Sequence, residues 1–291
     1  MKTNKIALSV IFICALLLLS GCGPKSGETA KLEISYEKFT LANGLDVILH
    51  ADHSDPITAV ALQYHVGSNR EEPGRTGFAH LFEHMMFQES QHVGQDQFFK
   101  KIQEAGGMLN GGTGQDGTTY FEVVPKNALE MVLWLEADRL GYLGSTLTQE
   151  AFANQQGVVK NEKRQVVDNR PYGHTDYILG KLVYPEGHPY SWDVIGSMED
   201  LTNATLKDVH QFHDKWYTPR NCTLVVAGDF DREQTVAWIK KYFEEIPSGD
   251  EVVDPKPQPV SLDAVKMAYF EDNFAKSPEP VSYTHLRAHE T

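Results

Sequence analysis

Cysteine is scarce in this sequence. Only Cys14, Cys22 and Cys222 occur among its 291 residues. The first two lie in or directly after an apolar leader, so Cys222 has no partner and a disulfide framework is excluded. Because Cys222 opens an apolar run that ends at Ala227, it indicates a small core residue rather than a nucleophile.

Basic residues are also few. Lysine and arginine total 26 against 40 aspartates and glutamates, which gives a formal net charge of -14 at pH 7. This excess of acid argues against nucleic acid or an anionic membrane surface as a partner. The charged residues are spread along the chain and 41% of the residues are hydrophobic, a composition typical of a folded globular protein. We find no internal repeat.

A single long apolar run, Ile6 to Leu19, lies near the start. It is too short and too poorly flanked for a spanning helix, and Lys2 and Lys5 precede it. The sequence Leu19-Ser20-Gly21-Cys22 then resembles a bacterial lipobox. We therefore expect a signal peptide at residues 1–21, a lipid on Cys22 and a polar tether at residues 22–34. An ordinary signal peptide with an incidental cysteine remains the alternative.

Glycine rather than aspartate follows Cys22. For a lipoprotein of a Gram-negative bacterium this implies sorting to the outer membrane. The expected location is therefore the cell envelope, with the protein held at a membrane by its lipid anchor.

The pattern beyond the tether predicts a mixture of strands and helices. The dipeptide Asn43-Gly44 between two short apolar runs indicates a hairpin. Strands are predicted at residues 39–41, 45–49, 57–66, 118–124 and 223–227. Helices are predicted at residues 76–87 with Thr76 as a possible cap, and at 97–104, 127–140, 149–168, 206–216 and 233–243. The fold class is therefore α+β with a mainly antiparallel sheet, in a domain at residues 35–250.

A proline-rich linker at residues 251–262 follows this domain. Val265 to Phe270 is predicted as the opening strand of a second domain that starts at residues 263–280 and is cut short. Residues 281–291 look like the translation of a sequencing adapter. We therefore give His285 and His289 no role as ligands.

Two stripes of the predicted helix at residues 76–87 differ in chemistry. One stripe is apolar and typical of a core-facing side: Phe78, Leu81, Phe82 and Met85. The other stripe carries His80, Glu83, His84 and Phe87. Two imidazoles one turn apart can reach a single metal ion, and Glu83 can stand beside that ion without ligating it. The alternative is two ordinary histidines near a glutamate.

A metal such as zinc needs a third protein ligand and an open position. Glu162 is the candidate because it shares a helical face with Val158, Val159 and Val166. A carboxylate on an apolar stripe is costly unless it is paired or metal-bound. Pairing with a nearby base is the alternative for this residue.

Three segments together resemble the insulinase/pitrilysin (inverzincin) peptidases. They run from Gly74 to Phe87, from Val158 to Glu162 and from Asp168 to Gly173, and the resemblance covers about residues 35–280. It implies that His80, His84 and Glu162 ligate Zn²⁺ and that Glu83 is the general base. It also implies that Asn110 hydrogen-bonds the backbone of a peptide substrate beside an edge strand.

The same resemblance implies a fold like that of the mitochondrial processing peptidase, as the first of two homologous domains. The arginine and tyrosine that hold the reacting carbonyl belong to the second domain. Gly111 replaces the alanine common in relatives, and Gln155 stands where some relatives have a second glutamate. That second departure puts the surroundings of the metal ligands in doubt.

The expected function is zinc-dependent endopeptidase activity on peptides or unfolded segments in the cell envelope. One alternative is a non-catalytic partner subunit of a two-chain peptidase. Another is an envelope lipoprotein that binds peptides without cleaving them. Glu83 separates these possibilities, because binding alone has no use for a base beside a metal.

Overall fold

The computed structural model describes residues 33–253 and 259–284. The expected signal peptide with Cys22, almost all of the tether, part of the linker, and both His285 and His289 lie outside these residues. The chain divides after Ser35, and the fold described below belongs to the unit that begins at Tyr36. Within the described part, no helix combines the length and the apolar character needed to cross a membrane.

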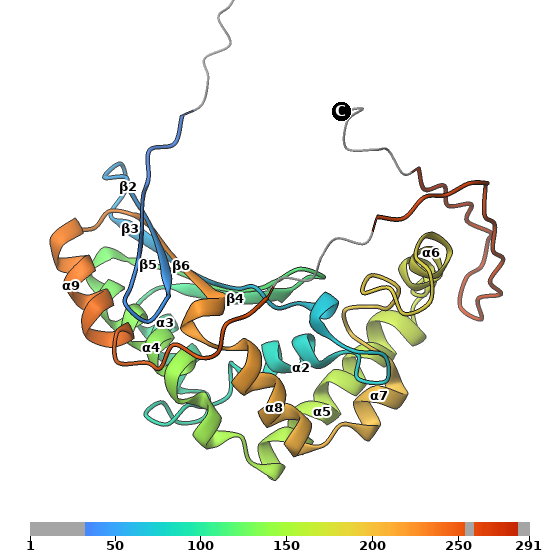
Figure 1. Ribbon diagram of the computed structural model, residues 1–291, viewed down its shortest axis with the longest axis horizontal. Helices are drawn as coiled ribbons and strands as arrows, with labels where there is room; N and C mark the ends of the chain where they lie inside the picture. Colours follow the sequence, from blue (N-terminus) through green and yellow to red (C-terminus); the bar gives the residue numbers. More distant parts are fainter. Residues whose placement is uncertain (1–32, 254–258, 285–291) are drawn as a thin grey trace, which may run out of the picture. The chain divides into compact units, whose positions relative to one another are not determined.

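A six-stranded sheet organises this unit (Figure 1), with the strand order β1-β2-β6-β3-β5-β4. The strands are β1 (Glu37–Thr40), β2 (Asp46–Ala51), β3 (Ile57–Tyr64), β4 (Met108–Thr113), β5 (Thr118–Pro125) and β6 (Cys222–Gly228). Only β2 and β6 pair in parallel, and the other neighbours are antiparallel. The predicted sheet type is therefore confirmed, as is the hairpin, in which Gly44 has φ of +91°.

One face of the sheet is buried and the other is half-exposed. In β3 the residues Thr58, Val60, Leu62 and Tyr64 are fully buried, while those between them are partly exposed. This alternation follows from the period of two in a strand. The helix α4 (Leu129–Tyr142) contacts β3 and β5, and α9 (Arg232–Phe243) packs against α4.

The predicted helices are confirmed with small changes at their ends. They are α2 (Phe78–Met85), α3 (Gln97–Glu104), α4, α5 (Gln149–Lys163), α8 (Leu206–Trp216) and α9. A 3₁₀ turn (Lys126–Ala128) precedes α4, and α5 stops at Lys163, where a π-helical turn (Arg164–Asp168) replaces the predicted continuation. Such turns accommodate one extra residue and often occur at functional sites.

The sequence pattern did not predict β4, α6 (Thr175–Val183) or α7 (Met198–Asn203). Conversely, the predicted strand from Val265 to Phe270 is wrong, because these residues adopt no regular secondary structure. A strand needs a hydrogen-bonding neighbour, and no described strand pairs with this segment. Its alternate residues are nevertheless apolar and almost fully exposed: Val265 is 90%, Met267 89% and Tyr269 90% exposed.

Candidate metal centre

The helix α2 has the two predicted faces. Its apolar stripe is buried in the core: Phe78, Leu81, Phe82 and Met85. The opposite face places His80, Glu83 and His84 in partly exposed positions on one side of the helix. The sequence spacing alone sets this arrangement, because residues three and four apart share a helical face.

The start of α2 is fixed by residues distant from it in sequence. Gly77, at the N-cap, has φ of +90°, and a Cβ there would lie 2.7 Å from the carbonyl oxygen of Ile195. The buried carboxylate of Glu71 accepts hydrogen bonds from the N–H groups of Gly77 and Ala79, at 2.9 Å each. Burial raises the pKa of Glu71 to about 8, although these N–H groups oppose the change.

Thr76 is therefore not the helix cap that the sequence suggested. Its N–H and its hydroxyl both donate to Asp200 Oδ2, at 2.9 and 2.5 Å, and the N–H of Ser197 donates to its Oγ1. Glu71 has taken the capping role because its buried carboxylate reaches the N–H groups at the start of the helix, which have no partner within the helix.

The helix α5 packs against α2 and brings Glu162 to the two histidines. His84 Nε2 lies 3.0 Å from Glu162 Oε2, and His80 Nε2 lies 3.7 Å from Glu162 Oε1. One ligand atom from each residue lies within 4.8 Å of the other two. The structure thus brings together the three residues predicted as ligands.

The chemistry of this group fits a zinc ion. Burial, followed by the charge of His84, lowers the pKa of His80 to about 4, so its imidazole is neutral at pH 7 and can donate a lone pair to a metal. Two nitrogen or oxygen ligands of a tetrahedral zinc, each about 2.0–2.1 Å from the metal, lie about 3.3 Å apart. The histidine nitrogens lie 3.0 and 3.7 Å from the two oxygens of Glu162, which is close to this value.

The apolar stripe predicted around Glu162 is only partly present. Val159 is buried, but Val158 and Val166 are each 41% exposed. Glu162 itself keeps 35% of its side chain exposed, so the side of α5 that carries it opens to solvent. Gln155, two turns before Glu162 in α5, is buried and does not join the ligand group.

Glu83 has a partner that the sequence did not suggest. Thr113, the last residue of β4, donates from Oγ1 to Glu83 Oε2 at 2.6 Å. If β4 had been predicted, the alternation of side chains along the strand would have shown which face of the sheet Thr113 occupies. Asn110 lies on the same edge strand but is exposed, and its Oδ1 accepts the N–H of Gly111 at 2.9 Å.

Gly111 faces the helix side of β4. A Cβ at this position would lie 3.0 Å from two ring atoms of Phe87, which lies two residues beyond the end of α2. Glycine therefore lets the edge strand approach Phe87 closely, where an alanine would have to displace the ring.

A buried ionic cluster lies behind this part of the site. Arg139 is 1% exposed and pairs with Glu136 and Glu122, which are fully buried. The guanidinium lies 4.3 Å from the ring centre of Tyr120 and 5.4 Å from that of Phe87. Burial, and then the charge of Glu136, raises the pKa of Glu122 well above its ordinary value. Burial therefore favours the protonated form of the Glu122 carboxyl group.

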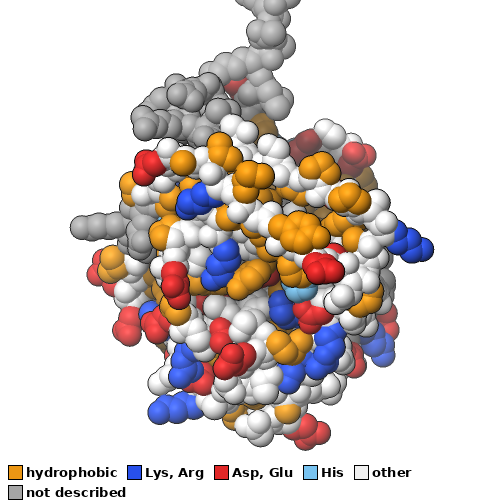
Figure 2. Space-filling view, turned by 90° about the vertical axis from the view of Figure 1, so that its right-hand side faces the viewer, with side chains coloured by type: hydrophobic (Ala, Val, Ile, Leu, Met, Phe, Trp, Pro, Cys, Tyr) orange, Lys and Arg blue, Asp and Glu red, His pale blue; other side chains and the backbone are white. Residues whose placement is uncertain are grey.

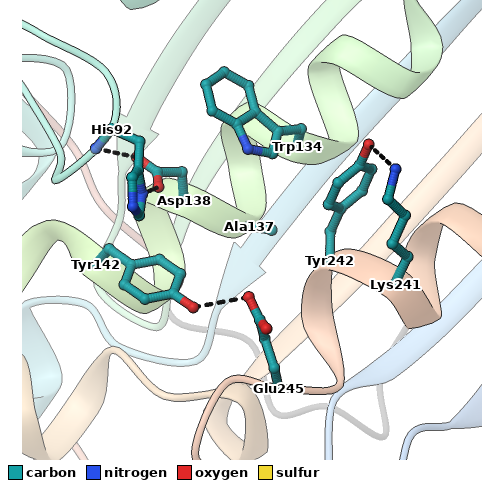
Figure 3. Close-up of a pocket in the computed structure, with 8 residues that line it drawn as sticks. All are labelled: His92, Trp134, Ala137, Asp138, Tyr142, Lys241, Tyr242 and Glu245. Atoms are coloured by element: carbon teal, nitrogen blue, oxygen red, sulfur yellow. Dashed lines mark hydrogen bonds and ion pairs between the residues drawn. The ribbon is translucent and has the colours of Figure 1, made fainter.

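A cavity of about 360 Å³ lies between α4 and α9 and contains none of the predicted site residues (Figure 3). It is lined by His92, Trp134, Ala137, Asp138, Tyr142, Lys241, Tyr242 and Glu245. Its charged groups are paired within the chain: Asp138 with His92, Lys241 with Glu130, and Glu245 with the hydroxyl of Tyr142. The cavity is therefore separate from the metal centre.

Comparison with protein families gives two matches. Residues 46–181 match the model of insulinase (peptidase family M16), and residues 203–276 match that of the peptidase M16 inactive domain. A zinc protease named PqqE from Helicobacter pylori is 34% identical over 76% of this chain and 50% of its own length. An uncharacterized zinc protease of Mycobacterium leprae is 28% identical over 77% of this chain and 49% of its own.

A solved structure of a protease from Helicobacter pylori is 33% identical, with a TM-score of 0.74 over 78% of this chain and 54% of that one. The first half of the periplasmic protease PqqL from Escherichia coli shares the fold, with a TM-score of 0.69 and 24% identity over 79% of this chain and 50% of that one. The chain spans about half the length of the relatives it matches. It belongs to the insulinase/pitrilysin family of peptidases, family M16.

Proposed function

We propose that this chain is the metal-binding half of a zinc-dependent endopeptidase. The observation that supports it most strongly is the convergence of His80, His84 and Glu162, with ligand atoms within 4.8 Å of one another. Glu83 lies on the same face of α2 as the two histidines. Relatives that share this fold and a quarter to a third of the residues are named zinc proteases.

In this proposal His80, His84 and Glu162 hold the metal. A zinc ion in such a site supplies Lewis acidity toward a carbonyl oxygen and lowers the pKa of a water to about 7. Glu83 accepts the proton of the attacking water at Oε1, since Oε2 receives the hydrogen bond of Thr113. The same carboxyl group then delivers that proton to the leaving amine.

The substrate is a peptide in an extended conformation. The strand β4 forms one edge of the sheet, and the open edge of a sheet can pair with a further strand through main-chain hydrogen bonds. Asn110 is exposed on that strand, where its amide can contact a substrate backbone. Recognition of this kind tolerates many sequences, because the main chain supplies most of the contacts.

Efficient hydrolysis also requires a second homologous domain. The segment around Val265, Met267 and Tyr269 presents apolar side chains that are about nine-tenths exposed, and such residues are normally buried by a partner. On the face shown in Figure 2, apolar side chains gather in the upper part and charged side chains mix below. The second domain would enclose the substrate and supply the groups that hold the reacting carbonyl.

We further propose that the protein is a lipoprotein of the cell envelope, attached to the outer membrane through Cys22. A relative of the same fold is described as periplasmic, and Leu19-Ser20-Gly21-Cys22 has the pattern of a lipidation signal. Expression in a bacterium should place the protein in the membrane fraction, and Cys22→Ser should lose a metabolic lipid label. Soluble mature protein with an unmodified Cys22 would contradict this assignment.

The metal assignment is tested by elemental analysis. The purified protein should bind one zinc ion, and His80→Ala/His84→Ala should lose most of it. Stoichiometric zinc in the double variant would refute the ligand set. A matched control is His53→Ala, because His53 is exposed and pairs with Asp229 away from the site.

The catalytic assignment is tested with Glu83→Gln in the full-length protein. This variant should keep its zinc and bind peptide, but lose at least about a hundredfold in turnover, the scale of general-base catalysis. Near-normal turnover, with contaminating proteases excluded, would show that Glu83 is not the base. A wild-type protein that binds zinc and peptide without cleaving the peptide would instead support a role in peptide binding alone.

A further inference from the structure

The hydroxyl of Thr113 donates its short hydrogen bond to the carboxylate of Glu83. Thr113 Oγ1 lies 2.6 Å from Glu83 Oε2, and an ionised carboxylate can only accept, so Thr113 is the donor. The neighbouring hydroxyl of Thr118 donates to the carbonyl oxygen of Val66 at 2.8 Å and lies 3.4 Å from Thr113 Oγ1. Glu83 Oε2 is thus much the nearer of the two oxygens to Thr113 Oγ1, and it receives the Thr113 proton.

The position of Thr113 is set by the sheet rather than by a mobile loop. Thr113 pairs in register with Thr118 of β5, and Thr118 is fully buried. Along β4 the side chains alternate, so Thr113 points to the same side as Gly111, toward α2, while Asn110 points to the exposed side. Threonine is also branched at Cβ, which limits its side chain to few rotamers.

We propose that Thr113 is a positioning residue for Glu83, a role that rests on the proposed function of Glu83 as the base. By holding Oε2, it fixes the plane of the carboxylate and leaves Oε1 as the oxygen that receives the proton. A hydrogen bond to a charged acceptor is among the stronger ones in proteins, so it can hold a carboxylate in one orientation.

The hydrogen bond from Thr113 to Glu83 also connects the strand that would bind the peptide with the base. The strand that carries Thr113 is the edge strand to which a peptide would add, and it carries Asn110 three residues earlier. One rigid element thus places both the peptide backbone and the base. A shift of this strand would move the peptide and the carboxylate together, and misplacement by about 1 Å can cost about a hundredfold in rate.

Three substitutions in the full-length protein isolate this hydrogen bond. Thr113→Val keeps the shape of the side chain and removes the donor, while Thr113→Ser keeps the donor. Thr40→Val is the matched control, because Thr40 ends the opposite edge strand and its hydroxyl donates to a carboxylate of Asp46 at the same distance, 2.6 Å. The measurements are bound zinc, peptide affinity, kcat and KM.

We expect Thr113→Val to retain zinc and peptide affinity and to lower kcat by about 10–100-fold, with KM little changed. Thr113→Ser should stay within about threefold of wild type, and Thr40→Val should not change kcat. A crystal structure of Thr113→Val should show the Glu83 carboxylate turned away from β4, which is a readout independent of activity. The expected changes in kcat are of this size because the base Glu83 is still present but is no longer held in one orientation.

A double-mutant cycle separates positioning from a general effect on the fold. Because Thr113 acts through Glu83, adding Thr113→Val to Glu83→Gln should cause no further loss of rate. An additive loss, or normal kcat in Thr113→Val, would overturn the inference while leaving Glu83 as the base. Normal turnover in Glu83→Gln alone would instead overturn the proposed function, so the two failures are distinguishable.

Discussion

Removing Arg139 should destabilise the domain more than most single substitutions. Its side chain is 1% exposed, and Glu136 and Glu122 beside it are fully buried. Its guanidinium also lies over the rings of Tyr120 and Phe98, at 4.3 and 4.5 Å from their centres. Arg139→Leu keeps an apolar side chain of moderate size but leaves two buried carboxyl groups without their cation.

The expected loss follows from the burial of these charges. Breaking a buried ion pair by removing one partner costs about 3–5 kcal/mol, because the remaining charge stays desolvated. A domain of this kind has a total stability of about 5–15 kcal/mol, so the variant should be close to unfolding at 37 °C. The ring contacts of the guanidinium add a smaller amount.

The loss of stability in Arg139→Leu should also grow as the pH rises. Burial raises the pKa of Glu122 above its ordinary value, so its carboxyl group binds a proton more readily in the folded protein than in the unfolded chain. A raised carboxyl pKa means that folding is favoured at low pH and that stability falls as the pH rises toward the folded pKa. Without Arg139 the ionised carboxyls lose their counter-charge, so the deficit should be larger at pH 8 than at pH 5.

Urea denaturation at pH 5, 7 and 8, followed by tryptophan fluorescence, measures the free energy of unfolding and its change with pH. Glu122→Gln should cost much less than Arg139→Leu, because an amide resembles the protonated carboxyl. Arg232→Leu is the exposed control, since Arg232 pairs with Glu37 at the surface, and its denaturation midpoint should not move measurably. A loss below about 1 kcal/mol for Arg139→Leu at pH 7, with an unchanged m-value, would refute the reasoning.

Two further predictions concern the start of α2 and the buried thiol. Gly77→Ala should cost at least about 1–2 kcal/mol and weaken zinc binding, because its φ of +90° disfavours a side chain and a Cβ there would meet a carbonyl oxygen at 2.7 Å. Gly157→Ala, inside α5 with open space around it, should instead stabilise by about 0.5–1 kcal/mol; urea midpoints and zinc content compare the two. Cys222 is 2% exposed and burial raises its thiol pKa, so a thiol reagent should label it only after urea is added, and rapid labelling of the native protein would contradict this.

Local patterns explain why much of this structure could be predicted from sequence. The spacing of His80, Glu83 and His84 fixes their shared face as soon as the helix forms, and the helix follows from the apolar residues between them. Glu162 is different, because only packing between α2 and α5 brings it within 3.0 Å of His84. Its helical face made it a candidate, but only the family resemblance joined it to the two histidines as a ligand of the same metal.

The missed strand β4 shows a limit of local propensity. Gly111 and Gly112 lie in its centre, and glycine weakens a strand because it has no side chain to pack. Pairing with β5 nevertheless forms the strand, and the glycines permit the close approach to Phe87. Thr113 was missed with it, since its role depends on the strand and on the carboxylate of another element.

The predicted strand from Val265 to Phe270 failed for the opposite reason. Apolar and polar residues do alternate in this segment, so its sequence suits a strand. A strand also needs a neighbour with which to pair, and alternation cannot supply one. In the described part of the chain its apolar side chains face solvent instead.

The relation between the two ligand-bearing helices is the part that no local pattern could give. Consecutive residues of α7 contact both of them: Asp200 accepts hydrogen bonds from Thr76 before α2, and the carbonyl oxygen of Leu201 accepts one from Gln156 of α5 at 2.7 Å. Because Asp200 and Leu201 are adjacent in one short helix, they limit how far α2 and α5 can move apart. A metal site whose ligands come from two helices needs such a constraint, since zinc tolerates only small departures from its ligand distances. The third helix that provides it lies outside every segment whose sequence suggested metal chemistry.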